Sequence, residues 1–429
     1  MVAAFPAAGD RCGIDTVEIA RVARLLEAND HSSIARLFSP RELADAGDGP
    51  GRAASLAARF AAKEACLKLF PREAALETIG ASDFSVERDA YGAPHVVPSP
   101  AAEVVMGRHR IARIALSMTH DATSASAVAV AQRATSATPP IGRFLWRFLP
   151  FRRDVIVENL RRVYGDRVDD LELERLAQMH YGHLARLFGE FLRFRWLSAA
   201  RKSALVRVEG LDMLRAVHAR GKGVLILTGH FGNWEVATVA GLRKFPEAHG
   251  RFHFVRRAIK PRWLEALVTR RFRRAGFGVL AKRGSLDELC ERLEAGDLVV
   301  FPFDQHASGR DGVVVDFFGH PAGTFRSLAV IAQATGAPVL PASSWREADG
   351  THVLRFEEPL APIVDDDPKV ELAANTRAYN AALERLVVRH PEQWWWVHRR
   401  WKAGRARPGR RETNRDGSDK PVESPGAPR

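Results

Sequence analysis

The stretch Val224-Leu225-Ile226-Leu227-Thr228-Gly229-His230-Phe231-Gly232-Asn233-Trp234-Glu235 decides how this chain is interpreted. An apolar run before a Thr-Gly turn predicts a buried strand that delivers His230 to its carboxyl end, with a helix just after it. A carboxylate five residues further on can hold one imidazole nitrogen, leaving the other to take a proton from an attacking hydroxyl. His230 is therefore the candidate catalytic base and Glu235 its orienting carboxylate. A buried histidine capped by a glutamate is the alternative that spacing alone leaves open.

The sequence around this stretch alternates between strand and helix patterns, which predicts an α/β sheet. The expected strands are 223–227, 252–255, 278–280, 298–303, 339–342 and 352–356. Asp304 directly follows one of them, a common position for functional residues in α/β sheets. A buried aspartate that caps the next turn is the alternative.

The N-terminal part has a different pattern, that of a small α+β domain. Residues 15–27 read as a strand and a helix, 56–69 as an amphipathic helix, and 111–118 and 124–130 as two antiparallel strands. The expected domains span 11–132 and 141–402. They are joined by a polar, Pro-containing linker at 133–140, with a leader at 1–10 and a disordered tail at 403–429.

The net charge of +13 is concentrated in the second domain. Residues 1–135 hold 15 Lys or Arg and 16 Asp or Glu, whereas the rest holds 49 and 35. Because no nucleic-acid motif appears and the basic residues alternate with apolar ones, an anionic membrane surface or an acidic carrier protein fits better than nucleic acid. Residues 141–153 interleave aromatic and basic side chains, which fits an interfacial anchor or a packed helix equally well.

The cysteines and the apolar runs indicate in which cellular compartment the protein works. Cys12, Cys66 and Cys290 have no paired or metal-like spacing, which indicates a reducing compartment. The sequence shows no signal-peptide pattern and no apolar run of about 18 residues, so we expect membrane contact rather than insertion.

Five blocks in the C-terminal part follow the order of one enzyme family. They are HFGNWE at 230–235, VR at 255–256 before KP at 260–261, FDQ at 303–305, FFGHPAGT at 317–324 and QWWWVHRRWK at 393–402. Over residues 140–402 the chain resembles the lipid A biosynthesis acyltransferases of the lysophospholipid acyltransferase superfamily. The resemblance implies catalysis by His230 and Glu235 and substrate binding by Arg256, Arg271 and Asp304. No metal-ligand spacing appears in this half, so we expect no metal there. Which arginine of the run around Arg271 corresponds to the family's functional arginine is open. Backbone N–H groups at 229–232 are candidate donors to an oxyanion. The Trp-rich run at 393–402 predicts packing rather than chemistry.

Four blocks in the N-terminal part carry a second resemblance. They are GIDTVEI at 13–19, RFAAKEACLK at 59–68, YGAP at 91–94 and LSMTH at 116–120. Over about residues 11–132 the chain resembles the holo-acyl-carrier-protein synthases, which are small phosphopantetheinyl transferases. The resemblance implies coenzyme A as substrate and Mg²⁺ held by Asp15 and Glu64, since this hard ion takes one or two carboxylates.

The same resemblance places four basic side chains near the phosphates. Lys68 would neutralise the leaving phosphate, Lys63 and Arg59 would reach the nucleotide phosphates, and His120 would lie near the same site. A surface pair between Glu64 and Lys68 is the alternative.

Together the two resemblances imply a bifunctional transferase at the cytoplasmic face of the bacterial inner membrane. One domain would charge an acyl carrier protein with phosphopantetheine, and the other would move an acyl group from its thioester to a lipid or glycolipid hydroxyl. The family's Gly-rich segment after the active lysine is replaced here by residues 69–73. The alternatives are therefore a housekeeping lipid A acyltransferase with an inactive docking domain, and a non-catalytic membrane scaffold. A homo-oligomer is compatible with the second resemblance.

Overall fold

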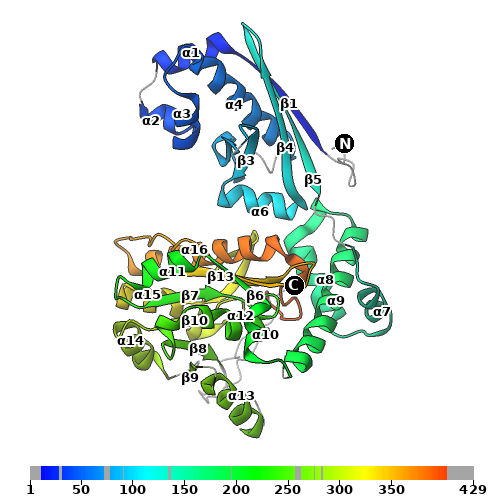
Figure 1. Ribbon diagram of the computed structural model, residues 1–429, viewed down its shortest axis with the longest axis vertical. Helices are drawn as coiled ribbons and strands as arrows, with labels where there is room; N and C mark the ends of the chain where they lie inside the picture. The colour runs from blue at the N-terminus through cyan, green and yellow to red at the C-terminus, as the bar shows by residue number, and fades with distance from the viewer. Residues whose placement is uncertain are drawn as a thin grey trace, which may run out of the picture.

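The computed structural model describes residues 11–28, 31–71, 78–89, 91–133, 137–194, 196–256, 262–274, 276–281 and 284–402. The predicted leader and tail, and the Lys260-Pro261 pair, lie outside these residues. Figure 1 shows an α+β domain above a larger α/β domain, which confirms the predicted fold class. None of the described helices is both long enough and apolar enough to cross a membrane.

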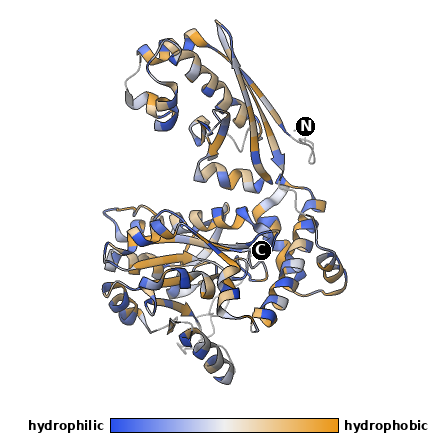
Figure 2. Cartoon of the chain, in the orientation of Figure 1, coloured by the Kyte–Doolittle hydropathy of each residue, from blue (hydrophilic) through white to orange (hydrophobic). Residues whose placement is uncertain are grey.

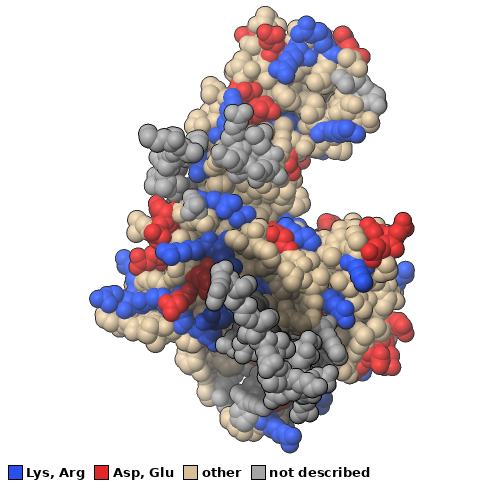
Figure 3. Space-filling model, turned by 180° about the vertical axis from the view of Figure 1, so that it is seen from behind, with Lys and Arg blue, Asp and Glu red and all other residues tan. Residues whose placement is uncertain are grey.

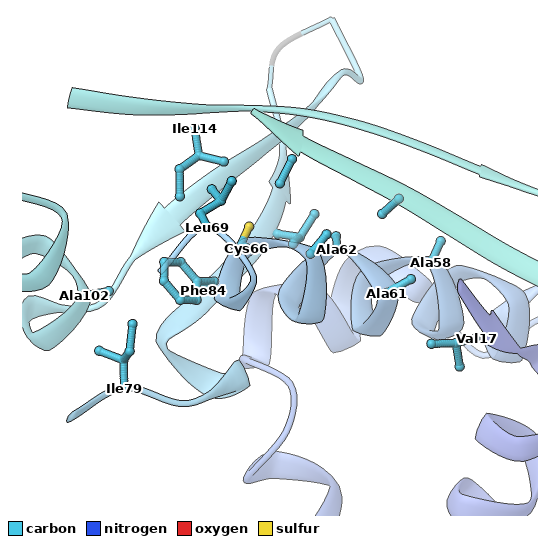
Figure 4. Packing of buried hydrophobic residues seen from close by; sticks show 14 of the residues in the cluster. Val17, Ala58, Ala61, Ala62, Cys66, Leu69, Ile79, Phe84, Ala102 and Ile114 are labelled. Atoms are coloured by element: carbon cyan, nitrogen blue, oxygen red, sulfur yellow. The ribbon is translucent and has the colours of Figure 1, made fainter. Parts of the chain in front are cut away.

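The N-terminal domain is built on a three-stranded antiparallel sheet covered on one face by helix α4 (Arg52–Leu67). The strand order is β1 (Cys12–Glu18), β5 (Ser124–Arg133), β4 (Ile111–His120). At Gly13 a Cβ would lie 2.0 Å from the backbone oxygen of Ala65, so only glycine lets α4 pack this closely against β1. The core between them is made largely of alanines, with Cys66 and Phe84 further along (Figure 4).

The remaining described elements of this domain complete its core. They are α1 (Ile19–Ala28), α2 (His31–Ala35), α3 (Pro40–Ala46), the hairpin of β2 (Phe84–Arg88) and β3 (Pro94–Pro98), and α6 (Pro100–Arg108). Helix α3 begins with a capping box, in which Ser39 and Glu42 satisfy each other's backbone N–H groups.

The C-terminal domain contains a seven-stranded mixed sheet whose central strands are apolar (Figure 2). Its order is β6 (Val206–Glu209), β14 (His352–Phe356), β13 (Val339–Arg346), β7 (Val224–Thr228), β10 (Leu298–Pro302), β8 (Phe252–Arg256), β9 (Phe277–Ala281). Strands β13, β7, β10, β8 and β9 run parallel, and the register pairs Thr228 with Pro302. All six predicted strands are confirmed. Strand β6 and the hairpin of β11 (Gly312–Phe317) and β12 (His320–Phe325) were not predicted, because their runs are short or contain Gly and Pro.

One group of helices covers the sheet, and a second group forms one side of the domain. Those on the sheet are α10 (Ala199–Ala204), α11 (Leu211–His218), α12 (Trp234–Gly241), α13 (Arg262–Arg274), α14 (Leu286–Glu294), α15 (Ser327–Thr335) and α16 (Pro368–Arg389). Helices α7 (Pro140–Phe148), α8 (Arg153–Tyr164) and α9 (Asp170–Phe194) lie together at the right of Figure 1. Seen from behind, Lys and Arg side chains crowd the lower domain on the side of these helices, with acidic ones among them (Figure 3).

The two domains meet where α6 lies against α16 (Figure 1). Gly107 allows close contact, because a Cβ there would lie 2.3 Å from the side chain of Val388. The Arg108 guanidinium donates to the carbonyls of Val163 at 2.9 Å and Phe318 at 3.3 Å. The domains are thus packed against each other rather than only tethered.

Candidate active sites

The His230 side chain pairs with Asp304 at the carboxyl ends of two neighbouring parallel strands. Each residue lies two positions beyond its strand, β7 or β10, so the sheet register brings them together. The imidazole Nδ1 lies 2.9 Å from Asp304 Oδ1, and the His230 backbone N–H donates to Oδ2 at 2.7 Å. A carboxylate accepts from Nδ1–H, so in the neutral form of the ring the lone pair that can accept a proton is on Nε2.

Asp304 is buried and is held as a carboxylate. Trp394 donates its indole N–H to Oδ2 at 3.1 Å, and Asp304 is only 1% exposed. Burial by itself raises the pKa of Asp304, but the charge and hydrogen bonds of His230 outweigh it, so the pKa lies well below its usual range. The result is a histidine with a charged partner, arranged as a general base requires.

This geometry corrects the predicted role of Glu235. We expected Glu235 to hold one nitrogen of the ring and Asp304 to bind substrate. In the structure Nδ1 is held by Asp304, because adjacent strand ends are closer in space than the fifth position along a loop and helix. Glu235 lies in the first turn of α12 and lines a groove beside the histidine.

The loop that carries His230 uses its backbone N–H groups to hold itself in place. Beyond the bond from His230 to Asp304, Phe231 donates to the Gly229 carbonyl at 3.1 Å and Gly232 to the Gln393 carbonyl at 2.9 Å. These three donors are therefore occupied, and the prediction that they stabilise an oxyanion is not supported by this arrangement.

An apolar groove of about 640 Å³ opens beside the pair. Its walls come from α7, from the loop that follows it, from α9 and from the start of α12. The lining residues are Leu145, Leu149, Phe151, Tyr181, Leu184, Ala185, Leu187, Phe188, Phe191, Asn233, Trp234, Glu235 and Trp395. Trp234 connects groove and base, since its ring centroid lies 5.1 Å from that of His230. A hydrocarbon chain in this groove would end near the imidazole.

Of the two arginines predicted to bind substrate, the structure describes the side chain of Arg256 but not that of Arg271. Arg256 ends β8, at the same edge of the sheet, and its guanidinium forms two hydrogen bonds to Glu265, at 2.9 and 3.1 Å. Arg271 lies in helix α13, but its side chain is outside the described part of the structure.

In the N-terminal domain, Asp15 and Lys68 lie together where β1 passes α4. The Lys68 ammonium lies 2.8 Å from Asp15 Oδ1 and donates to the Ile14 carbonyl at 2.7 Å. Glu64 is one helical turn before Lys68 and therefore lies on the same face of α4. No group of three or more His, Cys, Asp or Glu residues in the described ranges could hold a metal.

Lys63 is not part of this site, contrary to prediction. Its ammonium is buried against Glu42 Oε2 at 2.8 Å and the Phe84 carbonyl at 2.9 Å. Burial lowers the pKa of Lys63, and Glu42 opposes that shift. One position before Glu64, the side chain points about 100° further round the helix, into the core. His120 ends β4 and is exposed, with β5 between its strand and that of Asp15.

Comparison with known proteins identifies both halves. The model of the bacterial lipid A biosynthesis acyltransferase family matches residues 128–403. The chain belongs to this family. Residues 11–127 belong to the 4'-phosphopantetheinyl transferase superfamily. Both domains are thus of transferase families.

Individual relatives agree with this assignment. One is a phosphatidylinositol mannoside acyltransferase of Mycobacterium tuberculosis, 30% identical over 200 residues, which are 46% of this chain and 60% of that protein. The lipid A biosynthesis palmitoleoyltransferase of Escherichia coli is 26% identical over 265 residues, 61% of this chain and 82% of that protein. The holo-[acyl-carrier-protein] synthase of Clavibacter sepedonicus is 40% identical over 120 residues, 28% of this chain and 92% of that protein. The chain thus spans 60% of the length of the mycobacterial relative.

Sequence reasoning missed two features of the acyltransferase site. The groove depends on α9, whose aromatic residues near 181–191 gave a signal, but nothing in the sequence placed that helix beside His230. The Trp-rich run was predicted as packing, and Trp394, Trp396 and Trp401 are indeed buried. Trp394 also donates to Asp304, and Trp395 lines the groove, so the run contributes to the site as well.

Proposed function

We propose that the chain is a bifunctional enzyme that charges an acyl carrier protein with phosphopantetheine and transfers an acyl group from a carrier thioester to a lipid or glycolipid hydroxyl. The observation that carries the second activity is the His230–Asp304 pair at the end of an apolar groove. A histidine oriented by a carboxylate beside a hydrocarbon site fits the transfer of fatty acyl groups.

The acyl transfer follows from the geometry of that pair. The acceptor hydroxyl loses its proton to His230 Nε2 as its oxygen forms a bond to the thioester carbonyl carbon. Asp304 stabilises the imidazolium through Nδ1. The tetrahedral intermediate then collapses, the carbon–sulfur bond breaks, and the departing sulfur takes the proton from Nε2. The products are an ester and the free thiol of the carrier. The His230 side chain is 21% exposed, so a hydroxyl can reach it.

The nature of the acceptor is inferred from the relatives and the surface. Two relatives are named for acylating phosphatidylinositol mannoside and lipid A, both glycolipids. Phe188 and Phe191 line the groove and are 68% and 47% exposed, and Phe144 and Phe148 of α7 are exposed nearby. With the arginines of this region they suit contact with an anionic membrane, where apolar rings and cations both gain. These features support peripheral membrane contact, and we propose that it takes place at the cytoplasmic face of the inner membrane.

The segment at 141–153 has features of both predicted roles, an interfacial anchor and a packed helix. Phe144 and Phe148 point outward, as an anchor requires, and their rings lie 4.9 Å apart. Trp146 instead packs on Tyr181 at 5.4 Å and donates to Glu174 at 2.8 Å. Trp146 is therefore not available to enter a membrane, whereas Phe144 and Phe148 are, together with the exposed Ile141, Leu149 and Phe151.

The residues of the N-terminal site fit a magnesium ion. Asp15 and Glu64 supply the hard oxygen ligands that Mg²⁺ prefers, and two are enough for an ion that keeps waters and phosphate oxygens. When bound, the ion would neutralise charge on the pyrophosphate of coenzyme A. Lys68, beside Asp15, would bind the leaving phosphate.

The proposal is tested by assaying each variant for both activities. The full chain is incubated with apo-carrier, coenzyme A and Mg²⁺, and separately with acyl-carrier and anionic vesicles that contain a glycolipid. Mass spectrometry follows phosphopantetheine on the carrier and acyl groups on the lipid. Asp15→Ala should abolish only the first reaction and His230→Ala only the second. Parental acyl transfer by a folded His230→Ala protein would refute the base, and a parental chain without carrier modification would reduce the N-terminal domain to a docking module.

A further inference from the structure

Asn233, between His230 and Glu235, uses both ends of its side-chain amide. Its Oδ1 accepts from the backbone N–H of Val236 at 3.1 Å, which caps helix α12. Its Nδ2 donates to Glu190 Oε2 on α9 at 3.0 Å. Asn233 is 1% exposed, so its amide is shielded from bulk water, whereas the Glu190 side chain is 24% exposed.

Glu190 is in turn fixed by Arg346, at the end of β13. The Arg346 Nη2 donates to Glu190 Oε2 at 2.6 Å, and Nε forms an ion pair with Oε1. His352 Nε2 lies 3.8 Å from the same oxygen, but burial lowers the pKa of His352 despite the nearby carboxylate. Arg346 therefore supplies the positive charge at this carboxylate.

The same arginine also reaches the histidine loop from the other side. Its backbone N–H donates to Gln393 Oε1 at 2.8 Å, and Gln393 Nε2 donates to its carbonyl at 2.9 Å. The Gln393 carbonyl accepts from Gly232 N–H at 2.9 Å. The loop is thus connected to Arg346 at both Gly232 and Asn233.

A loop of this kind needs external support. Gly232 has φ +53°, and a Cβ there would lie 2.7 Å from the Ser344 carbonyl, so the chain turns sharply against β13. Within 229–232 the internal backbone bond from Phe231 to Gly229 spans only two residues. Small displacements of a base cost much of its rate, because the proton must move along a short, aligned path.

We propose that Glu190 and Arg346 are positioning residues for acyl transfer, which hold the loop of His230 through Asn233. The inference rests on the proposed acyltransferase function. Glu190 belongs to the helix that supplies Tyr181, Leu184, Phe188 and Phe191 to the groove. The carboxylate thereby ties the wall that holds the acyl chain to the loop that holds the base.

An exchange of the two partners tests the proposal. Asn233→Asp keeps a good cap for α12 but sets two carboxylates against each other. Glu190→Gln combined with Asn233→Asp restores one donor opposite one acceptor and keeps the net charge of the cluster. Glu158→Gln, a surface carboxylate on α8 paired with Arg162, is the matched control.

The expected result is a loss and a recovery of turnover. Asn233→Asp should lower kcat at least about tenfold, with KM for the acyl donor changed less than about threefold. The like charges at a buried position should also lower thermal stability, which the double variant should restore. The double variant should regain most of that loss, and Glu158→Gln should match the parent. A double variant no faster than Asn233→Asp, or an Asn233→Asp protein with parental kcat, would overturn the proposal.

Hydrogen exchange separates this proposal from the proposed function. The amides of 230–232 should exchange faster in Asn233→Asp and return to parental rates in the double variant. That pattern would support positioning even if the parental chain transferred no acyl group from any donor tried. Unchanged exchange in Asn233→Asp would refute positioning, whatever the activity.

Discussion

Replacing Asp304 with asparagine tests the mechanism most directly. The substitution keeps the shape of the side chain. Its carbonyl can still accept from the His230 backbone N–H and the Trp394 indole, which now lie 2.7 and 3.1 Å from Oδ2. The amide nitrogen would then occupy the position of Oδ1, 2.9 Å from His230 Nδ1. Because that nitrogen can only donate, and the retained oxygen lies 3.1 Å from Nδ1 but already accepts from two other donors, we expect Nδ1 to become the acceptor and the ring proton to move to Nε2, where the base is needed.

The expected loss is large because the wrong tautomer removes the base rather than weakening it. In serine proteases the equivalent change lowers kcat about 10⁴-fold, and we expect a decrease of roughly 10³–10⁴-fold here. The assay is kcat for acyl transfer at saturating donor. Asp349→Asn is the control, since Asp349 accepts only from Thr351 in a surface turn among the contacts described. A folded Asp304→Asn protein within about threefold of parental kcat would refute the assigned role.

The Asp304→Asn variant also tests how the stability of the fold depends on pH in acid. The pKa of Asp304 is lowered in the folded state, so its ionised form stabilises the fold above the unfolded pKa of about 4. That contribution is lost as the pH falls through the lower folded-state pKa. The melting temperature of the parental chain should therefore fall more steeply as the pH is lowered than that of Asp304→Asn.

Three further variants test other parts of the molecule. Lys63→Met should destabilise the N-terminal domain by about 3–5 kcal/mol in denaturant titrations, because it leaves Glu42 as an unpaired buried charge; a loss below about 1 kcal/mol would contradict the buried pair. Replacing both Phe144 and Phe148 with serine should reduce co-sedimentation with anionic vesicles at least about tenfold at unchanged thermal stability; equal co-sedimentation would rule out this anchor. Gly107→Leu should push α6 away from α16 and raise the radius of gyration measured by X-ray scattering, whereas an unchanged radius would show that the domains already separate in solution.

The sequence predicted most of the sheet because its strands are continuous apolar runs. Periodicity identifies such runs directly, and all six predicted strands of the C-terminal domain are present. Strand order is a matter of tertiary structure, so the neighbours of β7 could not be predicted. That is why Asp304, 74 residues away, was missed as the partner of His230 while the nearby Glu235 was chosen.

The error at Lys63 has a similar cause. The motif places Lys63 and Lys68 on one helix, and only the packing of α3 and β2 shows that the first points into the core. A sequence motif thus identifies the helix of a site more reliably than the direction of each of its side chains.

The contact between the domains connects the N-terminal domain to the surroundings of His230. Val104 on α6 packs against the same apolar cluster as Phe231, Trp394 and Val388. Trp394 in that cluster donates to Asp304, and Phe231 follows His230. Interiors are close-packed, so a helix that enters such a cluster affects the positions of its other members. The N-terminal domain is therefore part of the packing that supports the acyltransferase site, and removing it would expose that packing to water.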